Sequence, residues 1–274
     1  MYIYRDLGQP PGNYRPPLDK GGQPVGEGDA RHLLTILAGP SPYQPYLARA
    51  MAQHATTLPS RFFRVVTSVG TQVPQPLRHL FGTSGGRLVG GTIDRWSRTV
   101  YVVPAPGLRA ETRLEYALHE CVHLFAHPHV PAAGECPRVC IGTFQRAYGT
   151  GFGEGMTQVV AEDVMDAQGI SRYYRDRPYD AFTPVVRALI GFLGRDVIAR
   201  AYFFGAVPAL TTLMEARWGT AWRAVAGETT AGQKDRALAH LRRLEAAYQQ
   251  RVRDLVRQGP KGDFPTPRRS PAFA

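Results

Sequence analysis

The feature that most constrains the fold of this chain is a pair of histidines four residues apart. His119 and His123 lie in the segment RAETRLEYALHECVHLFA, residues 109–126. Apolar residues recur there at every third or fourth position, which predicts an amphipathic α-helix that stops at Pro128. Four residues advance a helix by slightly more than one turn, so both imidazoles lie on the same face. We therefore expect a fold that buries the apolar face of this helix and leaves the histidine face lining a site.

With Glu120 the two histidines form an H-E-x-x-H motif, whose spacing suits one zinc ion. Two imidazole nitrogens can bind Zn²⁺, while Glu120 lies close enough to reach a metal-bound water without binding the metal itself. Zinc lowers the pKa of such a water, and the carboxylate then takes its proton. The motif predicts zinc on His119 and His123 with Glu120 as general base. The alternative is an ordinary surface helix that carries two histidines.

A catalytic zinc site needs a third protein ligand, and the sequence offers three candidates. Glu154 begins a second predicted helix in GFGEGMTQVVAED, between glycines that allow another helix to come close. Glu162 lies two helical turns later. His129 follows His119 at the spacing of the metzincin third ligand, but Ala126 stands where that class has a glycine. The sequence favours Glu154, and His129 and Glu162 stay open as alternatives.

The segment HECVH, followed by FQRAYGTGFGEGMTQVVAEDV, resembles the gluzincin metallopeptidases, the thermolysin-like class. More narrowly, it is similar to bacterial HExxH proteins with an E-G-x-T segment, which often occur as effectors or toxins of contractile injection and type VI secretion systems. The resemblance covers roughly residues 85–215. It implies zinc on His119, His123 and Glu154, with Glu120 as base. It also implies a small sheet whose edge strand, Thr99–Val103, binds extended substrate.

The predicted fold class is α+β, with a zincin-like catalytic domain built from a small sheet and the active-site helix. Residues 1–30 are a flexible arm rich in Gly and Pro, and residues 31–168 form the catalytic domain with strands between residues 61 and 106. Residues 169–258 form a mostly α-helical C-terminal subdomain, and residues 259–274 are a flexible tail. Gln158 stands where thermolysin-like enzymes place an aspartate after the glutamate ligand, which puts the usual partner of a zinc-bound histidine in doubt.

A peptidase also needs a donor for the oxyanion that forms during amide hydrolysis. Four tyrosines near the second predicted helix are candidates, and the sequence does not choose among them: Tyr148, Tyr173, Tyr174 and Tyr179.

The chain has 3 cysteines, too few for a disulfide framework. Cys121 is expected to be a small buried hydrophobe on the active-site helix. Cys136 and Cys140 are expected to be free thiols, with a disulfide between them, or a second zinc site with His127 and His129, as alternatives.

The formal net charge of +11 is concentrated towards the C-terminus, in residues 233–274. A solvated helix face and tail explains it best, and a patch for an anionic partner is the alternative. No nucleic-acid-binding signature accompanies the charge, so nucleic acid is not an expected partner. The expected partners are a polypeptide substrate and a secretion or injection machinery.

No apolar run is long enough for a transmembrane helix, and the N-terminus has no signal-peptide pattern. These features predict a cytoplasmic protein in the producing cell, with any export by a route that needs no classical signal peptide. The predicted function is a zinc metalloendopeptidase (a hydrolase), serving as an effector or toxin or as a housekeeping protease. The alternative is a non-catalytic, basic, zinc-containing interaction module that binds an acidic partner.

Overall fold

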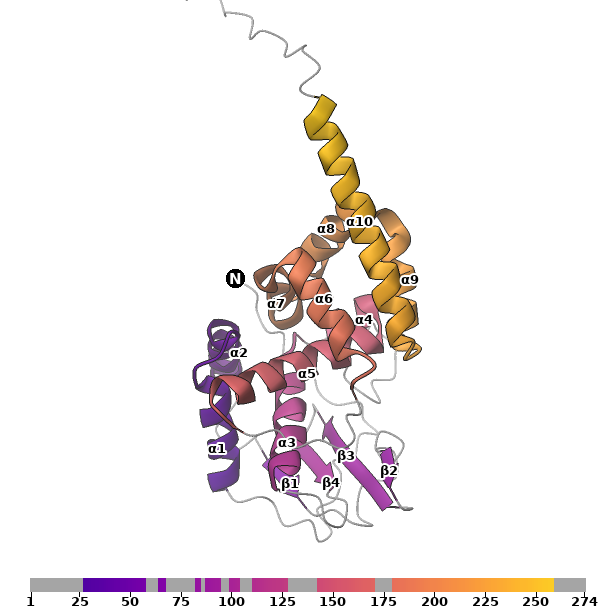
Figure 1. Cartoon of the computed structure of the whole chain (residues 1–274). Helices are drawn as coiled ribbons and strands as arrows, with labels where there is room; N and C mark the ends of the chain where they lie inside the picture. Colours follow the sequence, from indigo (N-terminus) through magenta and orange to yellow (C-terminus); the bar gives the residue numbers. More distant parts are fainter. Residues whose placement is uncertain are drawn as a thin grey trace, which may run out of the picture.

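The structure is a computed structural model that describes residues 27–57, 64–67, 82–84, 87–94, 99–103, 110–127, 142–170 and 179–258. Figure 1 shows short strands at one end of the molecule and helices α6 to α10 at the other, with α3 and α5 between them. This arrangement places the two helices predicted to carry the site at the centre of the molecule.

Two N-terminal helices, α1 (Glu27–Ala38) and α2 (Gln44–Thr57), lie side by side against the central helices. Leu33, Ile36 and Leu37 of α1 are buried, and their spacing of three and one places them on one face of the helix. The Gly39-Pro40 pair follows the end of α1 because proline cannot continue a helix.

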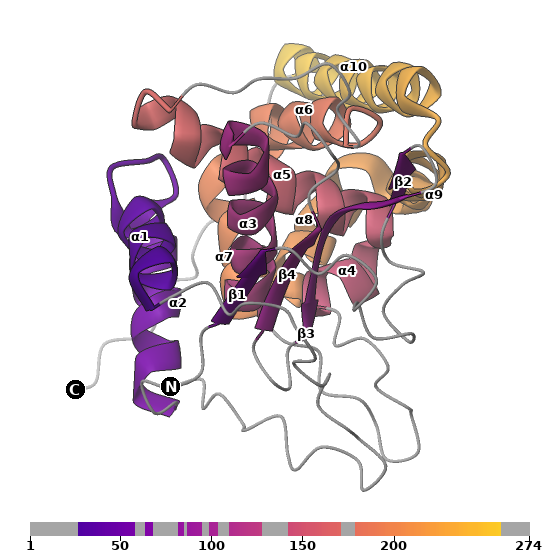
Figure 2. The same ribbon diagram turned by 90° about the horizontal axis from the view of Figure 1, so that it is seen from below.

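Four short strands pair in the order β1-β4-β3-β2, with β1 parallel to β4 and the other neighbours antiparallel. Figure 2 shows β1, β4 and β3 side by side near α3, which packs on β3 and β4. The expectation that Thr99–Val103 is an edge strand for substrate is wrong. This segment is β4 and lies between β1 and β3, so its backbone groups face a neighbour on both sides. The bounds are β1 Arg64–Thr67, β2 Gly82–Ser84, β3 Arg87–Asp94 and β4 Thr99–Val103.

The predicted α+β, zincin-like fold class is also wrong. Among the residues whose side-chain burial the structure describes, a set that leaves out the four short strands, 85% are helical and none lies in a strand. The physical reason is that the apolar side chains of the central helix α5 are buried by other helices. Helix α5 packs against α3, α4, α6 and α9, so helix-on-helix packing forms the core around the predicted site.

The central pair consists of α3 (Ala110–Phe125) and α5 (Thr150–Ala167), with the short α4 (Thr143–Tyr148) just before α5. Two glycines of α5 let neighbouring elements come close. A Cβ atom on Gly155 would lie 2.7 Å from Val186 of α6, and one on Gly151 would lie 2.7 Å from the backbone of Thr229 in α9. The prediction that glycines beside Glu154 permit close helix packing is therefore confirmed.

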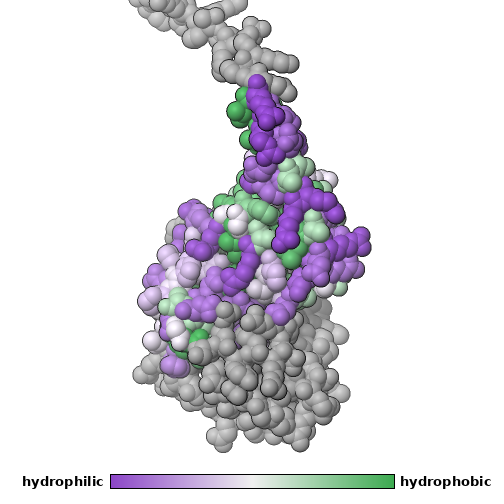
Figure 3. Space-filling model, in the orientation of Figure 1, coloured by the Kyte–Doolittle hydropathy of each residue, from purple (hydrophilic) through white to green (hydrophobic). Residues whose placement is uncertain are grey.

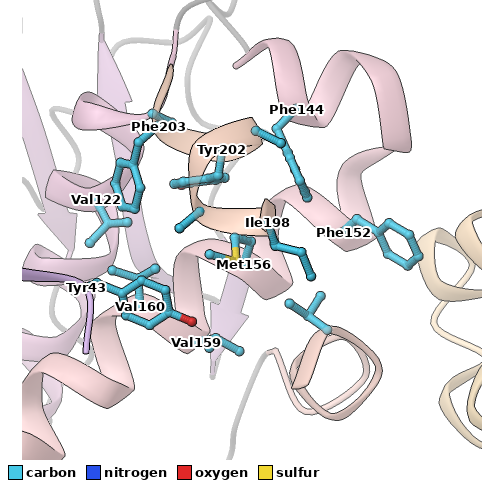
Figure 4. Packing of buried hydrophobic residues seen from close by; sticks show 14 of the residues in the cluster. Tyr43, Val122, Phe144, Phe152, Met156, Val159, Val160, Ile198, Tyr202 and Phe203 are labelled. Atoms are coloured by element: carbon cyan, nitrogen blue, oxygen red, sulfur yellow. The ribbon is translucent and has the colours of Figure 1, made fainter. Parts of the chain in front are cut away.

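The C-terminal helices wrap this pair, and three of them, α6, α7 and α8, are each followed by a glycine: Gly194, Gly205 and Gly219. Figure 4 shows part of the core that they share with α3 and α5, including Val122, Met156 and Ile198, all at most 2% exposed. The bounds are α6 Thr183–Leu193, α7 Arg195–Phe204, α8 Val207–Trp218, a 3-10 turn Gly219–Ala221, α9 Trp222–Thr230 and α10 Lys234–Gln258.

Among the helices of the described part of the chain, none combines the length and apolarity needed to cross a bilayer.

Candidate metal centre

Three side chains from α3 and α5 converge on one point. The Nε2 atoms of His119 and His123 lie 3.1 Å apart, and Oε2 of Glu154 lies 3.2 Å from the first and 3.1 Å from the second. Both histidines are buried, whereas the side chain of Glu154 is 20% exposed. The group is therefore enclosed by protein but open on the side of the carboxylate.

The outer nitrogen of His119 is held by Gln158, one turn after Glu154 on α5. The side-chain amide of Gln158 donates to Oε1 of Glu115 at 2.5 Å and to Oε1 of Glu162 at 3.3 Å. Because the two carboxylates occupy both N–H groups, the amide oxygen faces His119, and Nδ1–H of His119 donates to it at 2.9 Å. This tautomer leaves a lone pair on Nε2, directed at His123 and Glu154.

The outer nitrogen of His123 is held in a similar way by Thr157. The Thr157 hydroxyl donates to the backbone oxygen of Gly153 at 2.9 Å, so its lone pairs must accept from its other neighbours. Those neighbours are Nδ1–H of His123 at 3.2 Å and the hydroxyl of Tyr202 at 2.6 Å. His123 therefore also carries a lone pair on Nε2, and the unprotonated Nε2 atoms of the two histidines face each other.

This donor set fits a metal ion. The two Nε2 atoms lie 3.1 Å apart, and each directs a lone pair at the other and at the carboxylate oxygen of Glu154. These electron-rich atoms repel one another unless a positive charge lies between them. Ligand atoms around a tetrahedral zinc ion with bonds of about 2.0–2.1 Å lie about 3.3 Å from each other, close to the spacing seen here. The outer nitrogen of each histidine is also hydrogen-bonded, as is usual for metal-binding histidines. The group of His119, His123 and Glu154 can hold a metal ion.

The pKa shifts of the group agree with a site for a cation. Burial by itself would raise the pKa of Glu154, but His123 and His119 more than offset it, and the pKa lies well below its usual range. Burial would lower the pKa of His119, yet the hydrogen bond to Glu154 and the charge of Glu120 raise it. The site therefore stabilises positive charge, and a metal ion must compete there with protons.

Two further residues border the group. Glu120 is buried on α3, beside His119, and it is not one of the three residues whose ligand atoms converge. Tyr179 stacks on the ring of His119, with the ring centroids 4.3 Å apart and the planes 11° from parallel. Burial, followed by the charges of Glu154 and Glu120, raises the pKa of Tyr179 well above its usual value, so its hydroxyl keeps its proton.

The structure separates the other candidates from this point. Glu162 accepts from Gln158 and forms an ion pair with Arg187 at 2.8 Å, so it supports the outer side of the site instead of joining the three. The hydroxyl of Tyr148 donates to the backbone oxygen of Val207 at 2.9 Å, in the C-terminal helices. The remaining candidates lie outside the described residues: His129, Cys136, Cys140, Tyr173 and Tyr174. Cys121 is fully buried in the core, as predicted.

Three residues behind the histidines, Thr157, Tyr202 and Arg187, are not among the candidates that the sequence offers. Thr157 follows Glu154 by three positions on the same helix, so helical periodicity could have indicated it. Nothing in the sequence pointed to Tyr202 or Arg187, because they reach the site from α7 and α6 through tertiary packing.

Comparisons of the chain with protein-family models, with curated proteins and with solved structures found no match. The resemblance to gluzincins therefore stays a prediction that depends on the residues quoted above.

Gln158 is expected to hold His119 in its metal-binding tautomer. Substitution Gln158→Met keeps the length of the side chain but removes the acceptor, so we expect Zn²⁺ affinity to fall by about 10–100-fold. The matched control Gln168→Met removes an amide at the end of α5 that donates to the backbone oxygen of Ile36 and does not face the histidines, and we expect the affinity to stay within about threefold of wild type. Competition with a chromophoric chelator measures both. Wild-type affinity in the Gln158→Met variant would contradict the role given to this amide.

Proposed function

We propose that this protein is a zinc-dependent metallopeptidase in which His119, His123 and Glu154 bind the metal and Glu120 is the general base. The observation that carries the proposal is the convergence of three ligand atoms, with a second buried carboxylate, Glu120, near His119 and separate from the three. Three protein ligands leave one position of a tetrahedral ion open, which is the arrangement of catalytic zinc sites as opposed to structural ones. Zinc is the proposed metal because imidazole and carboxylate form its common catalytic ligand set.

Zinc bound at this site would supply a Lewis acid that makes water acidic and polarises a carbonyl oxygen. The residues of the chain do the rest. Glu120 takes the proton of the attacking water and returns it to the leaving amine. The support for this role is that Glu120 follows His119 directly on α3. Because Glu120 is buried beside the site, the transferred proton is kept from bulk water.

Tyr179 is the donor that we propose for the oxyanion. Of the two tyrosine candidates in the described residues, Tyr148 already donates to Val207 in the C-terminal helices, whereas Tyr179 lies over His119. Its raised pKa keeps the phenol protonated, as a hydrogen-bond donor to a developing negative charge must be. Stacking on His119 also fixes the orientation of that imidazole.

The proposed substrate is a polypeptide, because a general base that can reprotonate a leaving amine suits amide hydrolysis. The test is cleavage of a diverse peptide library by the purified full chain loaded with one equivalent of Zn²⁺, read by mass spectrometry. We expect cleavage to stop when a chelator removes the metal and to return when Zn²⁺ is added back. Mg²⁺ is the matched control and should not restore cleavage, because it disfavours imidazole ligands.

Two outcomes of this test would oppose the proposal. If the chain bound no Zn²⁺, the proposed ligands would be wrong. If it bound one Zn²⁺ firmly and cleaved no peptide, the alternative of a non-catalytic zinc-containing interaction module would be favoured.

A further inference from the structure

We propose that the C-terminal end of α10 is a docking surface for an acidic amphipathic helix of another protein. This surface consists of Val252, Leu255 and Val256, with Arg251 and Arg253 on either side of them and Arg257 next along the helix. It lies on the last two turns of a helix whose earlier turns are packed against the body. The inference is independent of the metal centre and of the proposed hydrolysis.

The apolar side chains of this surface continue a stripe that is buried earlier in the helix. Leu241 is fully buried, and Leu244 and Tyr248 are partly buried against the core. The same spacing of three and four residues then reaches Val252, Leu255 and Val256, which are 36%, 68% and 75% exposed. Among the described residues, these are the large hydrophobic side chains that are exposed. Their gathering at one place marks an interaction site more than an ordinary surface does.

The end of α10 extends away from the other helices, as Figure 1 shows in yellow. In Figure 3 hydrophobic side chains lie among strongly hydrophilic ones at this projecting end. A helix end that projects in this way leaves room for a second helix alongside it.

The middle of α10, just before the docking surface, is anchored to α8 by hydrogen bonds. Glu245 of α10 is buried and accepts from Arg217 at 2.7 Å and from the indole N–H of Trp218 at 3.1 Å, both on α8. One turn and a half later, Arg251 donates to the backbone oxygen of Arg217 at 2.6 Å. The helix therefore enters a complex already ordered, which lowers the entropic cost of binding.

The charges beside the stripe select the sign of the partner. Arg253 and Arg257 are exposed, and the one acidic residue nearby, Asp254, already accepts from Gln250 at 2.8 Å. In helix pairs, residues that flank the apolar seam form ion pairs across the interface and so decide which partner binds. The arginines on α10 therefore favour a partner helix that carries glutamates or aspartates at the facing positions.

The same charges argue against the other occupants. A second copy of α10 would bring arginines against arginines. The chain's own segment 259–274 has Lys261, Arg268 and Arg269 against Asp263, so it too is basic. A narrow stripe at this spacing also suits the seam of a helix pair better than the wide apolar face with which helices lie on membranes.

The test uses the full chain and two synthetic helical peptides of about 21 residues with leucines at the seam positions. One peptide has glutamates and the other lysines at the flanking positions. Fluorescence anisotropy should show the acidic peptide binding at least about tenfold more tightly, with the difference shrinking as salt rises from about 0.05 to 0.5 M. We expect Leu255→Asp, or Arg253→Glu with Arg257→Glu, to weaken this binding at least about tenfold.

Arg243→Glu is the matched control, since Arg243 is exposed on α10 away from this surface and should leave binding unchanged. All variants change exposed residues, and their thermal unfolding checks that the fold is kept. Equal binding of both peptides, or wild-type binding by the Leu255→Asp variant, would overturn the proposal. So would a dimer of the free chain that Leu255→Asp dissociates, or tighter binding to vesicles of anionic phospholipid than to the acidic peptide.

Discussion

Substitution Glu120→Gln is expected to lower kcat for peptide hydrolysis by about 10²–10⁴-fold while the zinc content of the protein stays at the wild-type level. Glutamine has the shape of glutamate but cannot take a proton from water at neutral pH. Glu120 is not among the three residues whose ligand atoms converge, so its loss should leave the metal in place. The measurement pairs kcat on one peptide identified from the library with zinc per chain by mass spectrometry.

The retained zinc is the internal control for this variant, because it reports that His119, His123 and Glu154 still meet. An unchanged rate would show that Glu120 is not the base. A loss of zinc together with activity would instead give Glu120 a part in holding the metal, and the separation of roles proposed above would be wrong.

Substitution Glu154→Gln is expected to remove zinc altogether under conditions in which the wild-type chain holds one equivalent. The amide keeps the size of the side chain, but a neutral oxygen or amide nitrogen replaces the anionic oxygen that lies 3.1–3.2 Å from both imidazoles. Loss of a ligand atom should weaken the site more than the roughly 10–100-fold that loss of an outer hydrogen-bond partner costs. Zinc content after dialysis, and affinity by chelator competition, measure the effect.

Glu162→Gln and His129→Ala are the matched controls for Glu154→Gln. Glu162 lies on the same helix but is engaged by Gln158 and Arg187, and we expect its variant to keep zinc. His129 lies outside the described residues, and its variant tests the competing ligand directly. Loss of zinc in His129→Ala but not in Glu154→Gln would move the third ligand to His129 and overturn the ligand set proposed here.

Much of the candidate site follows from local periodicity. The four-residue spacing of His119 and His123 places both on one face of α3, and the glycines beside Glu154 allow α5 to approach its neighbours. Gln158 shows the limit of such reasoning. Its departure from an expected aspartate suggested a missing partner, but Glu115 and Glu162 turn the amide so that its oxygen accepts from His119.

The fold class was the poorest prediction, because apolar runs in residues 61–106 suggested that a small sheet and the active-site helix together form the catalytic domain. A short apolar run states only that a segment can be buried, not what buries it. In the structure the side chains around the site are covered by α6, α7 and α9, so the core is helical. The strand Thr99–Val103 likewise could not be placed in the order of the sheet from its own residues, because strand order depends on pairing between distant segments.

The sequence by itself determined which residues could bind a metal and that two of them share a helix face, because a helix repeats every 3.6 residues. Only the tertiary structure decided that Glu154 meets both imidazoles, that Tyr179 covers His119, and that Thr157 and Gln158 fix the tautomers. Such contacts join residues from α3, α5 and the segment before α6, and their distances depend on how whole helices pack. The periodicity of one helix carries no information about a neighbour tens of residues away.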